Sequence, residues 1–581
     1  MLAAALTAVI AAVEEEALRL VEEFYRPQGP RGRGGHCEVD KEIEERLRAK
    51  LQAIIPCEFA GEETGMSSGS QAGYTWMVDP HDGTFDFMAG RRGSAISVGL
   101  VRGSLPVLGV VCSPLSPDRG QDTIAWAEGS QFILRNGRPV KNDLSRQALA
   151  AGDFVWATAS SALKPITWSL AVAPSRYVAM PSIAYRMARI AVGDGVATVS
   201  AHGVNEYDVA AGMALIGAAN GVVLDAEGRD AVLQANVSAR LSGVFAGAPE
   251  AARQLAKFTW AQLEQEPRRE PRTSPGFPRK NSSNLARAHG CLLGQVIGDS
   301  LGSRVEMKSA AEIQKLFPDG VRDLGDGGPY HTIAGQPTDD SEMALALARS
   351  LLRNRGFARH KVLDAYREWL QTRPIDIGET TERGLLGLHT TESESNGSLM
   401  RVSPIGIWAA GNPARAAEAA RLDSTLTHPN PVCVEACAAF CAAIAAGVGG
   451  ASREEMVKSA LANCTGPAHE AIRRNALPAD FSKGWVLTSL QNAFYRLSSN
   501  ASLEESLIAT VGCGGDTDTN AAIAGALLGA FHGREAFPAR WIFPVLACRP
   551  VAEAACPRPR PMDYWPDDVL DVAEALLALT P

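Results

Sequence analysis

Residues 76–84 read Trp76-Met77-Val78-Asp79-Pro80-His81-Asp82-Gly83-Thr84, a short apolar run that ends in an acidic turn. The apolar run favours a buried strand, and its proline and glycine favour a turn directly after it. Asp79 and Asp82 stand three positions apart, so their carboxylates can converge on one cation. Gly83 permits close approach of backbone N–H groups, which suits an anion such as phosphate. A ligand-bearing turn at the carboxyl end of a strand is typical of α/β folds.

Two acidic segments elsewhere in the chain support this interpretation. Gly61-Glu62-Glu63 precedes the turn, and Asn205-Glu206-Tyr207-Asp208 follows it much later. Taken alone, the turn could be an Asp-rich surface loop. The additional carboxylates weaken that alternative, because clustered carboxylates repel one another unless a cation or a proton compensates. Oxygen ligands of this kind favour Mg²⁺ or a similar hard ion.

The sequence around the turn mixes strand and helix patterns. Apolar runs bounded by turn-forming residues predict strands over 74–78, 94–101, 107–111 and 221–224. Helical periodicity predicts helices over 2–24, 40–54 and 182–193. We therefore expect the first half of the chain to be an α/β layered sandwich.

These motifs resemble the inositol monophosphatase-like superfamily, which includes the bisphosphate nucleotidases and fructose bisphosphatases. The resemblance covers about residues 1–255 and rests on Gly-Glu-Glu, on Trp-X-Val-Asp-Pro-X-Asp-Gly-Thr and on Asp-X-Ala-Ala-Gly. It implies a sugar-phosphatase fold and a phosphomonoesterase that uses two or more Mg²⁺ ions, with Mn²⁺ as an alternative. The metal ligands that it implies are Glu62, Asp79, Asp82, Asp208 and the main-chain carbonyl of His81.

The same resemblance implies catalytic roles for Glu62, Thr84 and Asp40. Thr84 would work with Asp40 to orient the attacking water, and the N–H groups of Gly83 and Thr84 would hold the phosphate.

The segment ahead of Asp40 departs from the family pattern. Gly35-His36-Cys37-Glu38-Val39 stands where the family has an Asp and a Thr, and Arg31-Gly32-Arg33-Gly34 replaces an expected lysine. Tyr207 replaces a tryptophan before the last ligand. These changes make Asp40 a less secure assignment than Asp79, and they leave the alcohol part of the substrate open.

A second set of carboxylates lies far along the chain. Thr338-Asp339-Asp340-Ser341 precedes a helical pattern, and Gly514-Gly515-Asp516-Thr517-Asp518-Thr519 precedes another. Paired acids at a helix start could simply cap the helix, because they satisfy its free N–H groups and favour its dipole. Two such starts with threonine hydroxyls would instead supply six oxygen ligands, which suits a centre of two Mg²⁺ ions. The long Ala/Leu-rich patterns at 341–353, 413–421, 432–447 and 520–531 predict an all-α fold for this half.

This half resembles the ADP-ribosylglycohydrolase family. The resemblance spans residues 288–541 and adds Gly290 to Gly302, Asn396-Gly397-Ser398-Leu399-Met400-Arg401 and Thr427-His428-Pro429 to the two acidic motifs. It implies metal ligation by Thr338, Asp339, Asp340, Asp516, Asp518 and Thr519. It also implies substrate binding by a diphosphate-cradling loop that comprises Asn396, Gly397, Ser398 and Met400.

Three further assignments in this half remain open. Asp299 could contact substrate or only brace its loop. Cleavage at ribose C1″ passes through an oxocarbenium-like state, and a nearby carboxylate can move the proton of the attacking water. Asp340 and Glu306 are both candidates for that catalytic role, and Glu306 could equally be a solvated helix residue.

Residues 264–284 are rich in proline and charge and almost without apolar side chains. Such a segment cannot bury enough surface to fold, so it indicates a linker. We expect a phosphatase domain over residues 1–260, a linker over 261–284 and a glycohydrolase domain over 285–581.

Composition limits the partners and the compartment. A net charge of -9 in 581 residues argues against general nucleic-acid binding, since no basic excess neutralises phosphates. Eleven cysteines without a CxxC pair indicate buried thiols in a reducing compartment, most simply the cytoplasm. The apolar start lacks a basic segment and runs into Glu14-Glu15-Glu16, so a soluble helix is expected rather than a signal peptide, and no membrane partner is expected.

Together the two halves predict a bifunctional Mg²⁺-dependent hydrolase. The second half would remove ADP-ribose from a modified protein or a small acceptor. The first half would release phosphate from a small phosphorylated metabolite, such as an inositol phosphate, a nucleotide or an ADP-ribose phosphate. In the alternative, only the second half is catalytic, and the first is a degenerate phosphate- or nucleotide-binding module.

Overall fold

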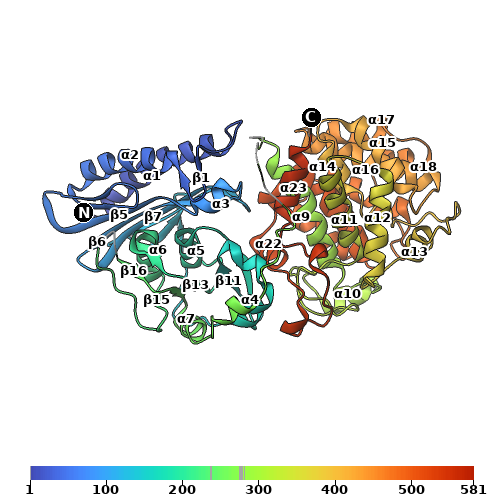
Figure 1. Cartoon of the computed structure of the whole chain (residues 1–581). Coiled ribbons are helices and arrows are strands. Elements are labelled where there is room, and N and C mark those ends of the chain that lie inside the picture. Colours follow the sequence, from blue (N-terminus) through green and yellow to red (C-terminus); the bar gives the residue numbers. More distant parts are fainter. Residues whose placement is uncertain (1, 236–238, 274–275, 277–278, 280–281, 581) are drawn as a thin grey trace. The chain divides into compact units, whose positions relative to one another are not determined.

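The computed structural model describes residues 2–235, 239–273, 276, 279 and 282–580 (Figure 1). The chain divides into two compact units, Met1–Lys280 and Asn281–Pro581. The start of the expected linker is structured as part of the first unit. Its residues form the short helix α8 (Gln262–Gln265), and the carboxylate of Glu266 accepts the N–H groups of Ile166 and Thr167 at 3.1 and 2.7 Å. Linker residues 274–275, 277–278 and 280–281 lie outside the described residues.

The first unit is built on an eight-stranded sheet. Its strands lie in the order β10 (Arg138–Val140), β9 (Ile133–Arg135), β8 (Gly120–Ala127), β7 (Leu105–Ser116), β6 (Ala95–Arg102), β5 (Gln71–Asp82), β3 (Cys57–Gly61) and β4 (Gly65–Ser67). Neighbouring strands are antiparallel except β3 and β5, which are parallel. The β5 strand therefore carries the acidic turn to the end of a central strand, next to the end of β3, where Glu62 follows.

A second, five-stranded sheet completes the first unit. Its order is β12 (Arg176–Ala179), β11 (Phe154–Ala157), β13 (Ala197–Ser200), β17 (Val244–Gly247) and β15 (Val222–Leu224). Helices α1 (Leu2–Phe24) and α2 (Glu38–Ile54) cover one face of the large sheet, and α5 (Ile183–Ala191) and α6 (Glu206–Ala218) fill the space between the sheets (Figure 1). Helices α4 (Pro165–Val172) and α7 (Pro249–Ala256) cover the outer face of the second sheet. This five-layer order confirms the expected α/β sandwich.

The short elements of the first unit are the hairpin β1 (Gly32–Arg33) and β2 (His36–Cys37), the helix α3 (Thr84–Met88) and the pair β14 (Val204–Asn205) and β16 (Arg240–Leu241). The hairpin contacts α3, so the Arg/Gly-rich segment lies beside the helix that follows the acidic turn.

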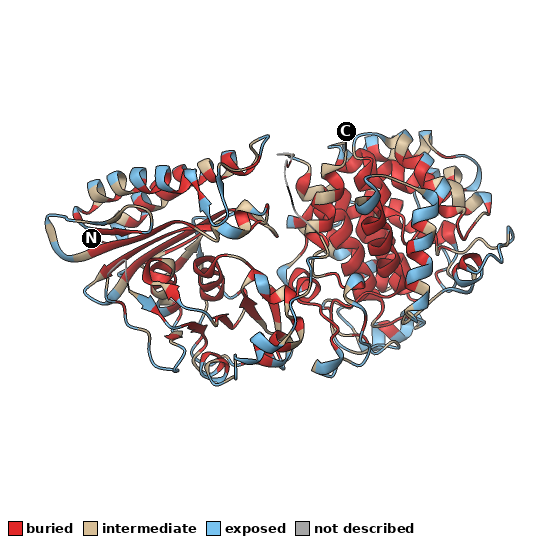
Figure 2. Ribbon diagram, in the orientation of Figure 1, coloured by how far each residue is buried: buried red, intermediate tan, exposed pale blue. Residues whose placement is uncertain are grey.

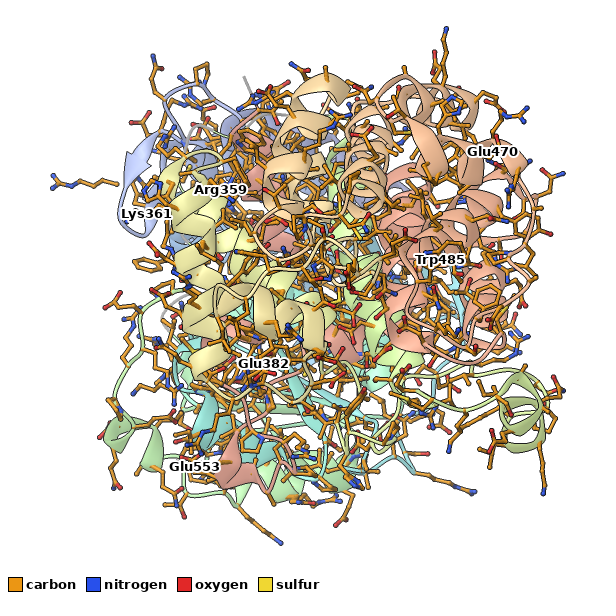
Figure 3. All side chains as sticks on the ribbon, turned by 90° about the vertical axis from the view of Figure 1, so that its right-hand side faces the viewer. Arg359, Lys361, Glu382, Glu470, Trp485 and Glu553 are labelled. Carbon is orange, nitrogen blue, oxygen red and sulfur yellow. The ribbon has the colours of Figure 1, made fainter. Side chains whose placement is uncertain are left out.

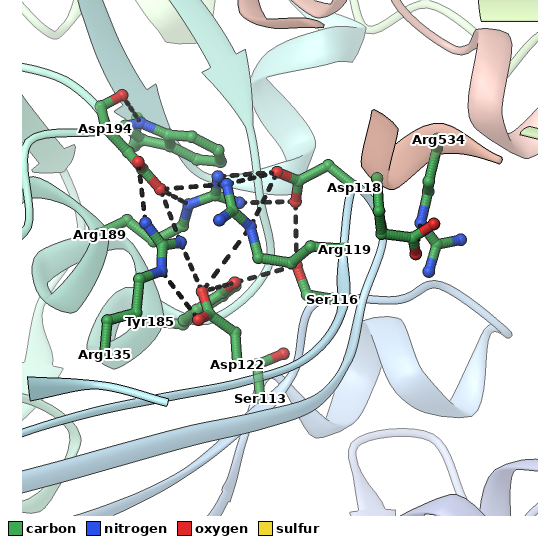
Figure 4. A network of polar contacts seen from close by, with 12 residues as sticks. Ser113, Ser116, Asp118, Arg119, Asp122, Arg135, Tyr185, Arg189, Asp194 and Arg534 are labelled. Carbon is green, nitrogen blue, oxygen red and sulfur yellow. Dashed lines mark hydrogen bonds and ion pairs between the residues drawn. The ribbon is translucent and has the colours of Figure 1, made fainter. Parts of the chain in front are cut away.

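A buried ion network ties the large sheet to α5 (Figure 4). Arg189 of α5 donates to both oxygens of Asp118 at 2.7 and 2.8 Å and to Asp194 at 2.7 Å. Arg135 of β9 bridges Asp122 and Asp194. Burial alone would raise the pKa of Asp118, but the guanidinium of Arg189 holds it well below its usual value. Arg119 also pairs with Asp118 and Asp194, so three arginines balance three aspartates, as buried charges require.

The second unit is a bundle of helices, and its described part contains strand pairing only as isolated bridges. Its helices are α9 (Leu285–Gly302), α10 (Ala310–Leu316), α11 (Asp339–Asn354), α12 (Arg359–Gln371), α13 (Glu379–Leu385), α14 (Ser403–Trp408), α15 (Pro413–Ser424), α16 (Pro431–Val448), α17 (Arg453–Ala462), α18 (Gly466–Arg474), α19 (Val486–Ser498), α20 (Leu503–Val511), α21 (Thr517–His532), α22 (Ala539–Leu546) and α23 (Val569–Ala578). The all-α expectation is confirmed. Figure 2 shows the buried residues gathered along its inner helices.

The α16 helix is long and apolar enough to span a membrane by length and composition. In the fold, 78% of that stretch is buried against other helices, as in the core of a globular unit. Cys433, Cys437 and Cys441 lie on its buried face, and all eleven cysteines of the chain are free thiols.

Helices α9 and α21 form the centre of the bundle and approach each other backbone to backbone. A Cβ at Gly294 would lie 2.3 Å from the carbonyl oxygen of Gly525, and a Cβ at Gly298 would lie 2.1 Å from that of Ala521. Only glycine permits this approach, because real Cβ atoms do not come so close. The contact brings the end of α9 beside the acidic start of α21.

Candidate metal centres and catalytic sites

The first candidate site lies where β5 ends and α3 begins. Gly83 adopts a left-handed conformation with φ of 95°, and it caps α3. A Cβ there would also meet Pro181 at 3.2 Å, so both conformation and space favour glycine. The turn directs Asp79 and Asp82 toward Glu62, which follows β3, and toward Asp208 in the first turn of α6.

The four carboxylates of this site influence one another strongly. Burial raises the pKa of Glu62 to about 7, and the charges of Glu63 and Asp82 add to the rise. Burial, followed by the charges of Glu62, Asp82 and Asp208, raises the pKa of Asp79 well above its usual value. The pKa of Asp208 is raised well above its usual value in the same way. The four predicted acidic ligands are therefore brought together, and their mutual repulsion is the condition that a bound cation would relieve.

Two of these carboxylates are held in place by hydrogen bonds. Asp82 accepts from the hydroxyl of Ser182 at 2.6 Å and from the N–H of Ala184 at 2.7 Å. Asp208 accepts from the N–H of Asn205 at 2.9 Å as part of a capping box. Each carboxylate therefore keeps lone pairs for a cation while its orientation is fixed.

Thr84 and Asp40 also meet at this site. The Thr84 hydroxyl lies 2.6 Å from the carbonyl oxygen of His81 and 3.3 Å from Asp40 Oδ2. The structure adds a contact that the sequence did not indicate, since the His81 ring reaches Asp40 Oδ1 with Nδ1 at 2.7 Å. Ligand atoms of Cys37, Asp40 and His81 lie within 4.8 Å of one another. Burial raises the pKa of the Cys37 thiol to about 12, which disfavours the thiolate that metal binding requires.

Glu44 of α2 is a site residue that sequence reasoning missed. It is fully buried, and its carboxylate accepts from the N–H groups of Glu63 and Thr64 at 2.9 and 2.7 Å. A Cβ at Gly61 would lie 2.3 Å from Glu44 Oε1, so the turn and the carboxylate fit closely. Glu44 thus shapes the Glu62 turn. Its position within a helix full of acids gave no distinguishing signal.

The second candidate site lies at the starts of α11 and α21. Asp339 and Asp340 open α11, and Asp516 and Asp518 open α21. Burial raises the pKa of Asp339 well above its usual value, and the negative charges of Asp376 and Asp299 add to the rise. Burial likewise raises the pKa of Asp518 well above its usual value, and the negative charges of Glu306 and Asp340 add to the rise.

Carboxylate and threonine oxygens of this site converge on one region. Carboxylate oxygens of Glu306, Asp516 and Asp518 lie within 4.8 Å of one another. Oδ1 of Asp340 is buried and has no hydrogen-bond partner in the described part of the chain. A buried acceptor without a partner is unfavourable unless a cation or an unseen donor satisfies it. The donor set therefore fits a hard divalent ion.

Thr338 and Asp299 form the floor of the second site. Asp299 accepts from the Thr338 N–H at 3.1 Å, from the Thr338 hydroxyl at 2.9 Å and from the Ser341 N–H at 3.1 Å. Burial raises its pKa to about 6. These bonds tie Asp299 to the start of α11, and its contact with substrate stays a prediction. Oγ1 of Thr338 also lies 3.1 Å from Asp340 Oδ2, so its one proton faces both carboxylates.

Glu306 lines the pocket of the second site. It accepts from the N–H of Thr517 at 2.8 Å and from the Thr517 hydroxyl at 3.1 Å, and both bonds use Oε2. Burial raises its pKa, and the charge of Asp516 adds to that rise. The alternative of a solvated helix residue is therefore wrong.

A pocket of about 830 Å³ opens over the second site. Among the predicted residues, Glu306, Asp339, Asn396, Gly397, Met400, Asp516, Asp518 and Thr519 line it. Asn396 donates to Asp516 Oδ2 at 2.6 Å and so links the loop to the carboxylates. Ser398 differs, since its buried hydroxyl contacts Ser424 and Cys437 rather than the pocket. Ser398 is not among the residues that line the pocket.

Three pocket residues had no signal in the sequence. Asp376 lines the pocket and accepts from the Tyr330 hydroxyl at 2.8 Å, and both come from loops without regular periodicity. The hydroxyl of Thr381 is buried at the pocket wall and has no partner among the described residues.

Trp485 lies close to this pocket, next to Gly484, which lines it. It is 44% exposed on the surface of the second unit (Figure 3). Its indole N–H donates to Glu394 at 2.7 Å.

Comparison with known proteins identifies both units. Residues 4–265 match the inositol monophosphatase family, and residues 280–578 match the ADP-ribosylglycohydrolase family. The chain is 30% identical over 270 residues to the ADP-ribosyl-[dinitrogen reductase] glycohydrolase of Rhodospirillum rubrum, covering 44% of this chain and 89% of that protein. It is 25% identical over 322 residues to the ADP-ribosylarginine hydrolase Tri1 of Pseudomonas putida, covering 51% of this chain and 85% of that protein.

The first unit has its own relative. The probable inositol 1-monophosphatase ImpA of Mycobacterium tuberculosis is 31% identical over 201 residues, covering 33% of this chain and 72% of that protein. Both families are hydrolases, and divalent metals are typical of both. The chain is therefore a fusion of a member of the inositol monophosphatase family with a member of the ADP-ribosylglycohydrolase family.

Proposed function

We propose that the chain is a bifunctional Mg²⁺-dependent hydrolase with one active site in each unit. The observation that carries this proposal is the convergence of buried, mutually repelling carboxylates in both units. Such clusters are unfavourable without a compensating charge, so their presence supports cation binding twice in the chain. Oxygen donors favour Mg²⁺, and Mn²⁺ is the closest substitute.

In the first unit, the proposed reaction is hydrolysis of a phosphate monoester. Glu62, Asp79, Asp82 and Asp208 would hold the ions with the carbonyl oxygen of His81. Bound Mg²⁺ would lower the pKa of water and neutralise charge on the phosphoryl oxygens. The Thr84 hydroxyl would orient the attacking water, and the start of α3 would present the N–H groups of Gly83 and Thr84 to the phosphate.

In the second unit, the proposed reaction is hydrolysis of the ADP-ribosyl bond at ribose C1″. The pocket volume of about 830 Å³ suits a ligand of nucleotide size. Asn396, Gly397 and Met400 would face the diphosphate. Thr338, Asp339, Asp340, Asp516, Asp518 and Thr519 would hold the ions. Of the two candidates for proton transfer, Glu306 lines the pocket and Asp340 does not, which favours Glu306.

The relatives and the fusion of the two units support the proposed substrate classes. The names of two relatives specify ADP-ribosyl groups on a protein and on arginine, which supports a modified side chain as one substrate. For the first unit we propose a phosphorylated nucleotide or ADP-ribose derivative, since a shared ligand would explain the fusion. A cytoplasmic location remains a prediction.

Matched variants of the full chain test both activities in one panel. Each substrate would be scored for release of free ADP-ribose and of orthophosphate, with Mg²⁺ and with EDTA. The substrates are ADP-ribosylated protein, ADP-ribosylated small acceptors, inositol monophosphate, adenosine 3′,5′-bisphosphate and ADP-ribose phosphate. We expect Asp516→Asn to abolish ADP-ribose release only, and Asp79→Asn to abolish phosphate release only.

Three outcomes of this panel would each contradict a part of the proposal. Phosphate release that persists in Asp79→Asn would place that activity elsewhere. No phosphate release by the wild type would favour the first unit as a binding module. A clear preference for inositol monophosphate would remove the proposed link between the two substrates.

A further inference from the structure

The side chain of His81 occupies an unexpected position in the first site. Its backbone carbonyl is a proposed metal ligand, but its ring turns toward Asp40 of α2. The ring is buried, with 1% exposure, and packs edge-on against Phe87 at a centroid distance of 4.3 Å. Both ring nitrogens have partners, Asp40 Oδ1 at 2.7 Å and the Ser94 hydroxyl at 3.1 Å.

Asp40 joins this ring to the residue that orients water. It is 2% exposed, and among the described residues its only ion-pair partner is His81. One of its oxygens faces the His81 ring, and the other lies 3.3 Å from the Thr84 hydroxyl. A buried carboxylate needs fixed donors, and here a single donor fixes which oxygen points to Thr84.

We propose that His81 is a positioning residue for phosphate ester hydrolysis in the first unit. Its Nδ1–H donates to Asp40, its Nε2 accepts from Ser94, and Phe87 fixes the plane of the ring. The one proton of Thr84 is then shared between the His81 carbonyl oxygen at 2.6 Å and Asp40 Oδ2 at 3.3 Å, so that it points away from the phosphate. Oγ1 of Thr84 is left with a lone pair that accepts a hydrogen bond from the attacking water. This inference rests on the proposed phosphatase function.

Three substitutions at His81 separate hydrogen bonding from shape. In His81→Asn, the amide nitrogen takes the place of Nδ1 and can still donate to Asp40. In His81→Gln, the longer amide reaches toward Ser94 instead. In His81→Leu, the volume is kept and both bonds are lost. All three retain the backbone carbonyl that is proposed to bind metal, so affinity for Mn²⁺ should stay unchanged.

The measurement is steady-state phosphate release by the full chain, with 4-nitrophenyl phosphate or the best ester of the panel. We expect His81→Asn to keep kcat within about threefold, and His81→Gln and His81→Leu to lose roughly tenfold or more, because misplaced groups lower the rate steeply. KM should change by less than about twofold, since the affected contact acts on water rather than on the ester. The double variant His81→Leu with Thr84→Val should lose no more than Thr84→Val alone.

A readout independent of activity accompanies the kinetics. The Nδ1 proton shared with Asp40 should give a downfield imidazole N–H resonance in ¹⁵N-labelled protein, which persists in Ser94→Ala and disappears in His81→Leu. Equal kcat in all three His81 variants, or no such resonance in the wild type, would overturn the inference and leave the proposed function intact. Failure of the wild type to release phosphate from any ester would overturn the proposed function, and the positioning role of His81 with it.

Discussion

At the residue scale, the buried hydroxyl of Thr381 is a candidate hydrogen-bond donor to the ligand of the second pocket. It lines the pocket wall without a described hydrogen-bond partner, and a Cβ at Gly397 would lie 2.7 Å from it. It therefore stands beside the loop proposed to hold the diphosphate. Buried hydroxyls are normally bonded, so a ligand oxygen is a natural acceptor for this one.

Replacing Thr381 by Val should weaken ADP-ribose binding by roughly tenfold, the usual effect of one hydrogen bond to a charged acceptor. The measurement is isothermal titration calorimetry of ADP-ribose with the full chain. Thr381→Ser keeps the hydroxyl and should bind within about twofold of the wild type. Equal affinity for the Val and Ser variants would show that the hydroxyl does not contact the ligand.

Single residues also mark where sequence reasoning stopped. The acids of both motifs could be assigned because each sits in a short segment of unusual composition. The roles of Asp376, Glu44 and the His81 ring could not be assigned from sequence, because each side chain contacts a partner that is remote in sequence. His81 lies 41 positions from Asp40, and only the packing of α2 against β5 brings them together.

At the scale of elements, long periodic segments were predictable, whereas β15, expected at 221–224, was the one strand of the second sheet that was predicted. The helix expected over 2–24 is α1, and the strands expected at 74–78 and 107–111 are the centres of β5 and β7. Strands such as β11 and β13 are four residues long and buried. Short apolar runs of that kind look alike in strands and helices, so periodicity cannot assign them. The second sheet was therefore missed as a sheet, although the layered α/β class was correct.

The contact between α9 and α21 carries the element-scale prediction. Gly298→Ala would place a Cβ 2.1 Å from the Ala521 carbonyl, so the helices must separate. Overpacking of this kind costs about 1–3 kcal/mol. Because α9 and α21 position Glu306 and Asp518, ADP-ribose release should fall along with stability. Thermal unfolding of the second unit and the glycohydrolase rate would measure both effects.

The matched control is Gly217→Ala on α6, where a Cβ meets nothing within 4 Å. That change should be neutral or slightly stabilising for the first unit, since alanine favours helix over glycine. It should leave the second unit's unfolding unchanged. A Gly298→Ala protein with wild-type stability and rate would mean that the close contact of α9 and α21 is not required.

At the scale of the whole molecule, the carboxylate centres link stability to pH and to metal. Burial raises the pKa of Glu62 from 4.5 to about 7 in the folded state. A carboxyl with a raised pKa holds its proton more tightly when folded, so its contribution to stability is lost as pH rises from about 4.5 to about 7. Asp79, Asp208, Asp339 and Asp518 shift in the same direction. In EDTA, the chain should therefore be less stable at pH 8 than at pH 6.

Mg²⁺ should reverse this loss, because it binds the ionised carboxylates of the folded state and hardly those of the unfolded chain. Calorimetric scans of the full chain at pH 6 and pH 8, each with EDTA and with Mg²⁺, should show a larger rise of Tm with Mg²⁺ at pH 8. Asp79→Asn should remove the Mg²⁺ response of the first unit and raise its Tm in EDTA at pH 8, since one repelling charge is gone. Asp518→Asn should do the same for the second unit only. A Mg²⁺ response that is equal at both pH values, or that survives both substitutions, would mean that these carboxylates do not hold the ion.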